Sequence, residues 1–253
     1  MTSNDEHSEL VSQVRSLVKD AKKIVFFTGA GISRESGIPT FRGEEGLWKK
    51  YDPTRLASFS AFIADPRLVW EFFYSRQRLI CQANYNQGHQ AIAMLEASRP
   101  GVCNVLTQNI DRLHQRAGSK DVIELHGNIF GVECKECGFD EQLDHSNFFT
   151  RFNESSIPRC SVCESIMKPS VVLFEESLPA NEWQKAIYLS GNCDLMFIVG
   201  SSLNVSPANT LPYYALRNKA TLIEVNPNET EMTNLMNYSF RASASEILPR
   251  LLM

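Results

Sequence analysis

Short apolar runs of strand length alternate with helical patterns along most of the chain. The chain opens with apolar residues that recur every three to four positions from Leu10 to Ala21, as on one face of an amphipathic helix. The expected strands are Ile24 to Thr28, Val102 to Leu106, Val122 to Leu125, Ser170 to Leu173, Leu195 to Val199 and Thr221 to Val225. The expected helices between them are Gly88 to Ala97, Asn181 to Leu189 and Pro207 to Arg217. This alternation predicts an α/β fold, a doubly wound parallel sheet with helices on both faces.

Two stretches interrupt the alternation. Residues 42–85 hold a loop and two helical patterns but no clear strand, and residues 128–169 are polar and carry four cysteines. Both have the pattern of insertions into a sheet-based domain. We therefore predict a main α/β domain and a small second domain. The main domain comprises residues 1–41, 86–127 and 170–253, and the small domain residues 42–85 and 128–169.

Composition and charge exclude several classes of protein. The chain has 253 residues, of which 43% are hydrophobic and 21% charged, as in a globular protein with a buried core. Its formal net charge of −4 gives no basic footprint for nucleic acid. No apolar run approaches the ~20 residues that span a bilayer, and the polar start, Met1 to His7, resembles no secretion or import signal. We expect a cytoplasmic protein that binds neither nucleic acid nor membrane.

Four of the seven cysteines form two Cys-x-x-Cys pairs. Cys134 and Cys137 are separated from Cys160 and Cys163 by 22 residues. Each pair can fold into a knuckle that offers two thiolates, and two knuckles complete a tetrahedral zinc site. A thiol redox motif would instead require one pair at the start of a βαβ unit. The pattern predicts a structural zinc with no open position for chemistry.

The first strand ends in a glycine-rich turn, Gly29-Ala30-Gly31-Ile32-Ser33. Glycines allow the backbone to approach a pyrophosphate, and free amides at a helix start bind anions, although an ordinary strand-to-helix turn has the same pattern. The full dinucleotide fingerprint is absent, because Arg34 occupies the place of the third glycine and no acid ends a strand about 20 residues later. A hydride-transferring dehydrogenase is therefore disfavoured, and dinucleotide binding stays open.

Two polar segments follow strands at the expected carboxyl edge of the sheet, where open α/β sheets bind ligands. His126 follows the strand Val122 to Leu125 and can be a general base near neutral pH, or only a polar cap. The segment from Thr107 to Asp111 follows the strand Val102 to Leu106. Its amide and carboxylate side chains can bind a carboxamide or a ribose hydroxyl, or form an Asx-type turn.

Taken in order, these segments resemble the sirtuin family over roughly residues 20–251. The matching segments are Gly29-Ala30-Gly31-Ile32-Ser33, Gly37-Ile38-Pro39-Thr40-Phe41-Arg42-Gly43, Thr107-Gln108-Asn109-Ile110-Asp111, His126-Gly127, the two cysteine pairs, Gly200-Ser201-Ser202-Leu203 and Val225-Asn226. The resemblance implies a doubly wound NAD-binding domain and a small domain with helices and a four-cysteine zinc ribbon. It also implies an NAD-dependent protein lysine deacylase. Such an enzyme consumes NAD as co-substrate, acts on acylated-lysine proteins or peptides, and yields nicotinamide, deacylated lysine and O-acyl-ADP-ribose.

The resemblance implies residue roles by position. His126 would be the general base, and Phe41 would shield the reacting carbon. The other positions expected to contact NAD are Gly29, Ala30, Gly31, Ser33, Thr40, Arg42, Gln108, Asn109, Ile110, Asp111, Gly200, Ser201, Ser202, Asn226 and Ala244. Val172 and Phe174 would line the groove for an extended substrate peptide.

Three positions depart from the family pattern. Glu175 and Ala242 stand where the family usually has glycine, and Thr40 replaces a common aspartate, although one subclass carries threonine there. A bulky residue at position 175 can narrow the peptide groove, and it requires a backbone shift if the glycine had positive φ. These departures concern peptide preference more than the reaction.

The segment around Phe73 resembles the sirtuin subclass that removes succinyl, malonyl and glutaryl groups. That subclass carries a tyrosine and an arginine three residues apart on one helix face. Arg76 matches the arginine, Phe73 occupies the tyrosine position, and Ala57 matches a small residue that widens the acyl pocket. We expect a wide, partly apolar pocket for acetyl and longer acyl chains, with residual desuccinylation. Protein ADP-ribosylation, NAD hydrolysis and a catalytically silent NAD- or peptide-binding module remain alternatives.

Overall fold

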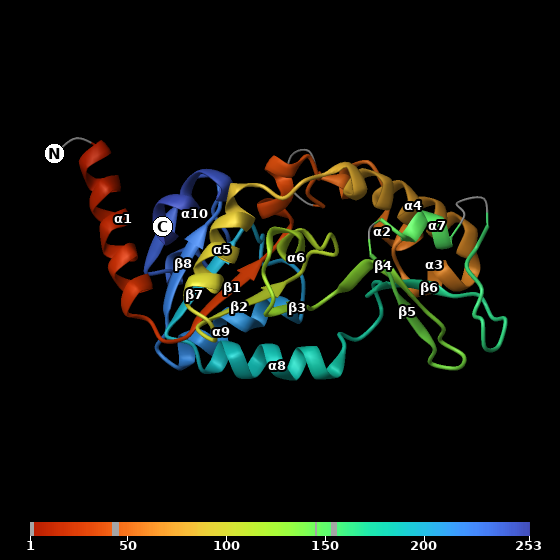
Figure 1. The fold of residues 1–253 in the computed structure, drawn as a ribbon. Helices are drawn as coiled ribbons and strands as arrows, with labels where there is room; N and C mark the ends of the chain where they lie inside the picture. The colour runs from red at the N-terminus through yellow and green to blue at the C-terminus, as the bar shows by residue number, and fades with distance from the viewer. Residues whose placement is uncertain (1–2, 42–45, 145, 153–155) are drawn as a thin grey trace.

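The computed structural model describes residues 3–41, 46–144, 146–152 and 156–253. Its main sheet has six parallel strands in the order β3-β2-β1-β7-β8-β9 (Figure 1). These strands are β1 (Ile24–Thr28), β2 (Cys103–Thr107), β3 (Val122–Glu124), β7 (Leu195–Val199), β8 (Thr221–Val225) and β9 (Tyr238–Phe240). The predicted doubly wound parallel sheet is confirmed.

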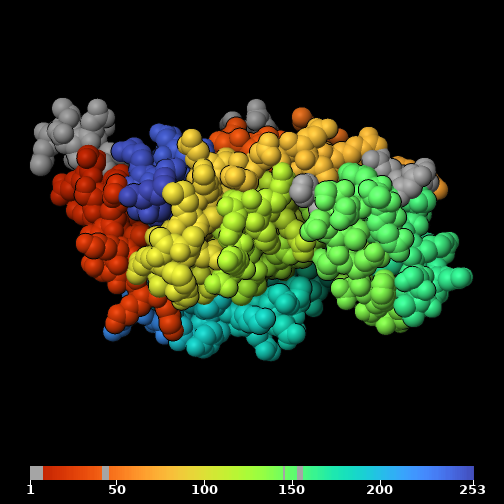
Figure 2. All heavy atoms as spheres, viewed as in Figure 1, coloured from red at the N-terminus to blue at the C-terminus, as the bar shows by residue number. Residues whose placement is uncertain are grey.

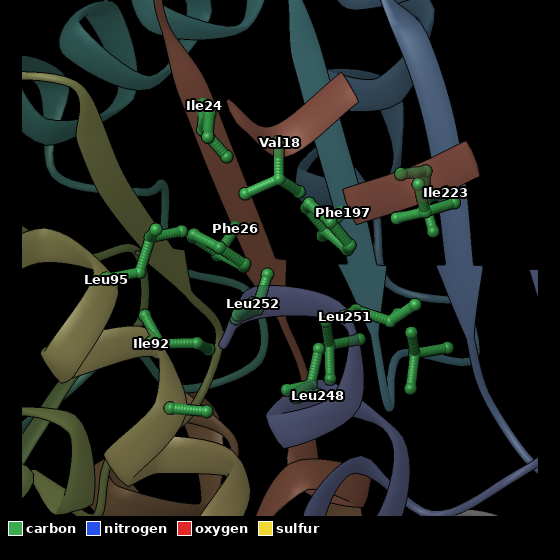
Figure 3. Packing of buried hydrophobic residues seen from close by; sticks show 14 of the residues in the cluster. Val18, Ile24, Phe26, Ile92, Leu95, Phe197, Ile223, Leu248, Leu251 and Leu252 are labelled. Atoms are coloured by element: carbon green, nitrogen blue, oxygen red, sulfur yellow. The ribbon is translucent and has the colours of Figure 1, made fainter. Parts of the chain in front are cut away.

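Apolar side chains on both faces of the strands explain why the sheet is covered twice. Ile24 and Phe26 of β1 join one core cluster, and Val25 and Phe27 join another, because successive strand residues point to opposite faces. Helices α1 (Ser3–Asp20), α5 (Gln87–Ser98) and α10 (Ala244–Leu252) cover the first face. Figure 3 shows their apolar residues packed against the strands. Helices α8 (Ala180–Gly191) and α9 (Leu211–Arg217) cover the second face.

A second body combines a helical module with a small antiparallel sheet. The module contains α2 (Pro53–Leu56), α3 (Phe59–Ala64) and α4 (Pro66–Gln82). The sheet, in the order β5-β4-β6, comprises β4 (Gly127–Glu133), β5 (Asp140–Gln142) and β6 (Lys168–Val171), with α7 (Phe148–Arg151) beside it. The two share one apolar core, and the Trp70 indole N–H donates to the Met167 carbonyl at 2.9 Å. We propose on this basis that both insertions form a single small domain.

The strand expected at 170–173 is wrong in its placement. It begins at Lys168, ends at Val171, and pairs antiparallel with β4 instead of joining the parallel sheet. An apolar run indicates burial but not the partner strand. The domain border predicted at residue 170 therefore lies inside this strand. The small-domain end of the molecule, in green, lies opposite the N-terminal helix, in red (Figure 2).

Short elements complete the chain, and most of them escaped the sequence prediction. They are η1 (Ala30–Ser36), η2 (Leu47–Lys49), α6 (Leu113–Ala117), η3 (Ala208–Thr210) and η4 (Thr233–Leu235). Strand β9 was also missed, since three residues carry little periodicity, and so was helix α10, whose nine residues include Pro249. Among the helices that the structure describes, none is both long and apolar enough to cross a bilayer.

Candidate functional site

A cavity of about 570 Å³ opens at the carboxyl ends of the parallel strands. The strand order reverses between β1 and β7, and such a switch point is where open α/β sheets bind ligands. Of the predicted NAD contacts, those that line this cavity are Gly29, Ala30, Gly31, Thr40, Phe41, Gln108, Asn109, Ile110, Gly200, Ser201, Ser202 and Asn226. His126 and the predicted substrate positions Ala57, Phe73, Arg76, Val172 and Phe174 line the same cavity. One continuous hollow thus joins residues from segments that are far apart in the sequence.

A side pocket of about 30 Å³ accounts for two further predicted positions. Ser33 and Asp111 line it together with Ala30, Phe41 and Ile110. The last three residues also line the main cavity. Ala244 lines neither hollow and is 4% exposed, so its predicted NAD contact stays a prediction. Arg42 lies outside the described residues.

The glycines of the first turn have a packing role that the sequence did not reveal. A Cβ on Gly31 would lie 2.6 Å from the Cα of Gly200, and one on Gly29 would lie 2.8 Å from the Gly200 carbonyl oxygen. The amides of Gly29 and Gly31 donate to Val199 and Gly200 at 3.0 and 2.8 Å. The ends of β1 and β7 therefore touch directly, and these two amides are already occupied. The expectation of free amides at this turn is wrong for both of them.

The side chain of His126 is held in a defined tautomer. Its Nδ1 lies 3.0 Å from the backbone carbonyl oxygen of Gln108. Because a carbonyl oxygen only accepts, Nδ1 carries the proton and Nε2 keeps a free lone pair. Burial lowers the pKa of His126 from 6.5, while the bond to Gln108 opposes that shift. The imidazole is therefore neutral at physiological pH and can accept a proton at Nε2.

Gly127 fixes the backbone directly after this histidine. Its φ is +70°, and a Cβ there would lie 2.0 Å from the Ser170 carbonyl oxygen. Only glycine fits such a close approach of strand β6. The His126 carbonyl also accepts the Val172 amide at 2.9 Å, so the predicted peptide groove is tied to the histidine.

Asp111 is held in a buried polar network behind the side pocket. Its carboxylate accepts the Ser33 hydroxyl at 2.7 Å and the Leu113 amide at 2.9 Å. Asn109 donates to the Gly29 carbonyl at 3.1 Å and to Ser33 Oγ at 3.2 Å. Burial raises the pKa of Asp111, and these bonds oppose the rise. The Asp111 and Asn109 side chains thus support the wall of the side pocket. Their hydrogen bonds within the protein already use much of the hydrogen-bonding capacity that was expected to bind a carboxamide.

Two buried histidines extend this network and were missed by the sequence analysis. The His89 ring lies 3.4 Å from Ser33 Oγ, and His114 Nε2 lies 3.0 Å from Thr28 Oγ1. Their ring centroids are 4.9 Å apart. Burial lowers the pKa of His114 to about 3 and lowers that of His89 well below 6.5. Both are neutral parts of the folded core, in regions where the sequence shows only helical periodicity.

We predict that acid weakens the fold through His114. Its folded pKa of about 3 lies below the unfolded value near 6.5, so its stabilisation is complete above pH 6.5 and is lost as pH falls toward 3. Between pH 7.5 and 5 this histidine alone should lower the free energy of unfolding by about 2 kcal/mol. Asp111, with its raised pKa, offsets part of the loss in more acidic solution.

Urea unfolding at both pH values, with wild type and His114→Gln, measures this effect. The variant is the necessary comparison because zinc-ligand cysteines also take up protons in acid. We expect the pH-dependent loss to be smaller in His114→Gln by about 2 kcal/mol. An equal loss in both proteins would contradict the assignment.

A four-residue turn follows the predicted peptide groove. The Glu176 amide donates to the Leu173 carbonyl at 3.1 Å, which closes the turn, and Glu175 has φ +77°. The positive φ that the sequence analysis considered at position 175 is therefore present. It costs about 1 kcal/mol in a residue other than glycine. The Glu176 carboxylate accepts the Leu173 amide at 2.9 Å and pairs with the buried Lys168 at 3.0 Å. This end of the groove is anchored on the small sheet.

The predicted acyl pocket is lined mainly by aromatic side chains. Besides Ala57 and Phe73, it is lined by Trp48 and Phe72, whose rings stack with centroids 6.0 Å apart. Arg76 points into this region, with its guanidinium carbon 5.9 Å from the Phe72 centroid. Its Nε is buried without a hydrogen-bond partner among the described residues. Sequence reasoning missed Trp48 and Phe72, because no motif marks them.

The four paired cysteines come together as predicted. Their sulfur atoms all lie within 4.8 Å of one another, with Cys134 and Cys163 3.5 Å apart and Cys137 and Cys160 3.5 Å apart. A tetrahedron with metal–sulfur bonds of about 2.3 Å has edges of about 3.8 Å. The Val162 amide points at Cys160 Sγ at 3.4 Å, as in a knuckle that donates to a thiolate. The cluster fits a structural zinc.

Comparisons with known proteins agree over nearly the whole chain. Residues 29–207 match the model of the Sir2 family. An NAD-dependent protein deacylase of Pyrococcus abyssi is 42% identical over 242 residues, which cover 95% of this chain and 96% of that protein. A Sir2 homologue solved with NAD has a TM-score of 0.87 at 38% identity, covering 95% of this chain and 92% of that one. A Sir2 structure with a p53 peptide and NAD⁺ has a TM-score of 0.83 at 35% identity, covering 95% and 96%.

Proposed function

Because this chain belongs to the Sir2 family, we propose that the crevice at the carboxyl edge of its sheet is where it deacylates lysine. The chain is an NAD-dependent protein deacylase that acts on protein substrates. NAD would supply the ribose: its bond to nicotinamide breaks as the acyl oxygen bonds to the same carbon, and with one water consumed the acyl group passes to a ribose hydroxyl and the lysine amine leaves. The products are nicotinamide, free lysine and O-acyl-ADP-ribose. The following paragraphs assign residues of this chain to that reaction.

The observation that carries the assignment is the geometry of His126. Its Nδ1–H is held by the Gln108 carbonyl, so Nε2 is the proton acceptor in the cavity. Its own carbonyl holds the Val172 amide of the peptide groove. The base therefore lies where the NAD-lined and peptide-lined parts of one cavity meet. We assign it the removal of a proton from a ribose hydroxyl, which then attacks the acyl carbon.

The side pocket is assigned to nicotinamide. It is lined by Ile110 and Phe41 and backed by the Ser33–Asp111 hydrogen bond. Such a rigid wall can bind nicotinamide more tightly after its bond to ribose is broken than while it is still part of NAD. This difference in binding assists bond cleavage. Gln108 donates to Ser201 Oγ at 2.9 Å, and Asn226 donates to the Ser201 carbonyl at 2.9 Å. This bonded group is assigned to the ribose and adenosine side.

A panel of acylated and unmodified peptides, assayed with NAD, tests the function. We expect nicotinamide release only with acylated peptide, in equal amounts with free lysine and O-acyl-ADP-ribose. Release without an acylated peptide would indicate NAD hydrolysis, and a mass gain of ADP-ribose on the peptide would indicate transfer to protein. No release with any acyl peptide would leave a binding module.

We predict that Phe73 limits activity on acidic acyl groups. Arg76 can pair with a distal carboxylate, but Phe73 lacks the hydroxyl that would add a second bond. A hydrogen bond to a charged group contributes ~1.5–3 kcal/mol, so Phe73→Tyr should raise succinyl kcat/KM by about 10-fold or more. Acetyl turnover should change little. Arg76→Met should abolish the residual succinyl activity.

The exposed Arg78 on the same helix provides the matched control. Arg78→Met removes the same charge from α4 without altering the cavity lining, so its succinyl-to-acetyl ratio should equal that of wild type. Unchanged succinyl turnover in Phe73→Tyr or in Arg76→Met would refute the pocket assignment. A cytoplasmic location and the absence of nucleic-acid binding remain predictions from the sequence.

A further inference from the structure

The turn at Leu173 to Glu176 carries a non-glycine residue where the backbone favours glycine. Glu175 has φ +77°, a conformation that side chains rarely adopt. Such strain persists where surrounding contacts hold it.

The Glu175 carboxylate binds the start of helix α3, 115 positions away in sequence. It accepts the Ser60 amide at 2.9 Å and the Ser60 hydroxyl at 2.9 Å. Ser60 lies in the first turn of α3, where backbone amides lack helical partners and favour a negative charge. Both carboxylate oxygens are thus engaged by one residue of the helical module.

Backbone bonds join the same two segments beside this contact. The Phe174 amide donates to the Ala57 carbonyl at 2.8 Å, and the Phe59 amide donates to the Phe174 carbonyl at 3.0 Å. Ala57 and Phe174 both line the cavity. The distance between these segments therefore determines the width of one part of the opening.

The other side of the turn is already fixed. Glu176 pairs with Lys135 and Lys168 at 3.0 Å each, and Lys168 is 1% exposed. Adjacent glutamates thus hold the turn to two parts of the second body, the small sheet through Glu176 and the helical module through Glu175. The contact of Glu175 with Ser60 joins the turn to helix α3 on the side of the acyl pocket.

We propose that Glu175 is a positioning residue that clamps segment 57–60 onto the turn at Phe174, and so sets the width of the entrance for the acyl-lysine. The inference rests on the assignment of this groove to an acylated peptide. A loose entrance binds the short acetyl-lysine less well and discriminates less against bulky acyl groups. The clamp acts on peptide binding and leaves NAD binding and proton transfer unchanged.

Steady-state kinetics of Glu175→Gly and Ser60→Ala, with acetyl and long-chain acyl peptides, test the clamp. The contact is exposed, so its loss in Glu175→Gly should raise KM for the acetyl peptide about three- to fivefold. kcat and the KM for NAD should stay within twofold of wild type, and the acetyl preference over the bulky group should fall. Ser60→Ala keeps the amide bond and should give a smaller change in the same direction. Glu175→Gln keeps one acceptor and should restore part of the acetyl affinity.

Lys219→Gly is the matched control for relief of backbone strain. Lys219 also has a positive φ, +62°, and it lies exposed after α9, away from the cavity. It should leave every kinetic constant unchanged. An unchanged or lower acetyl-peptide KM in Glu175→Gly would overturn the clamp, as would a parallel fall in kcat and thermal stability with no change in KM. An effect seen only with peptides that carry flanking arginines would also overturn it, because it would indicate direct attraction of the peptide.

Calorimetric titration with the acetyl peptide separates this proposal from the enzyme assignment. If wild-type protein binds the peptide but releases no nicotinamide, the proposed function fails while the binding constants of the variants still test the clamp. If the wild type is active and the variants bind normally, only the clamp fails.

Discussion

Replacement of His126 by alanine should lower kcat for deacylation by about 100-fold or more, the range expected when a general base is lost. No other described group is held at this junction with a free proton acceptor fixed by a backbone bond, as Nε2 is fixed through Gln108. The variant should fold and bind NAD, because His126 is only partly buried and its backbone bonds persist. Steady-state kinetics, with calorimetry for NAD, provide the measurement.

Two further readouts distinguish a lost base from a damaged site. Nicotinamide exchange precedes the proton transfer assigned to His126, so the variant should still incorporate labelled nicotinamide into NAD in the presence of an acyl peptide. Burial lowers the pKa of His126, so wild-type kcat/KM should hold to below pH 6.5 before it falls in acid. That acid limb should vanish in the variant. Near-normal deacylation by a folded His126→Ala protein would remove this histidine from the mechanism.

The sequence predicted the centre of the sheet well because its strands are buried on both faces. The predicted bounds of β1, β7 and β8 match the structure, since parallel strands covered by helices are nearly continuous apolar runs. The polar residues after these runs were placed at one edge by the same logic. Parallel strands end at a common edge, so Gln108 and His126 were both expected at that edge, and both line one cavity.

Contacts between distant segments could not be derived in this way. The strand at Lys168–Val171 has the apolar pattern of a sheet strand, but this pattern does not identify its partner. It pairs with β4, where Gly127 has no Cβ and so leaves room for the Ser170 carbonyl. The contact of Glu175 with Ser60 joins positions 115 residues apart, and no periodicity signals it. His89 and His114 occupy helical positions that apolar residues usually fill, and only burial shows that they support Ser33 and Thr28.

The resemblance to a family added what physical reasoning could not assign. Taken alone, the glycine turn was compatible with an ordinary strand-to-helix turn, and two of its amides prove to be occupied by the end of β7. The ordered set of motifs identified the family, which the comparisons confirm. The residue-level roles then depend on geometry, and there the structure separates positions that line the cavity from Ala244, which does not.

Loss of the metal site should have the second large effect, and it should act through folding. Cys134 and Cys160 are each 2% exposed and belong to the apolar core of the small domain. The Cys134→Ala variant leaves three thiolates, which cannot complete a closed tetrahedral site. Binding energies of structural zinc are about 10–16 kcal/mol in isolated zinc-finger peptides, so its loss should unfold at least the small sheet. Zinc content should fall from one per chain to near zero, and deacylase activity should fall with it.

Cys81 lies outside the four-cysteine cluster and allows a matched control, since Cys81→Ala removes a thiol and leaves the cluster intact. Zinc content, melting temperature and activity should then stay near those of wild type. In Cys134→Ala, peptide binding should fail before NAD binding, because Lys168 and Glu133 of the small sheet hold the turn that carries Phe174, whereas most of the proposed NAD contacts follow strands of the main sheet. Chelation of zinc from the wild type should reproduce this order. A metal-free Cys134→Ala protein that is stable and fully active would show that the four thiols are not a structural zinc site.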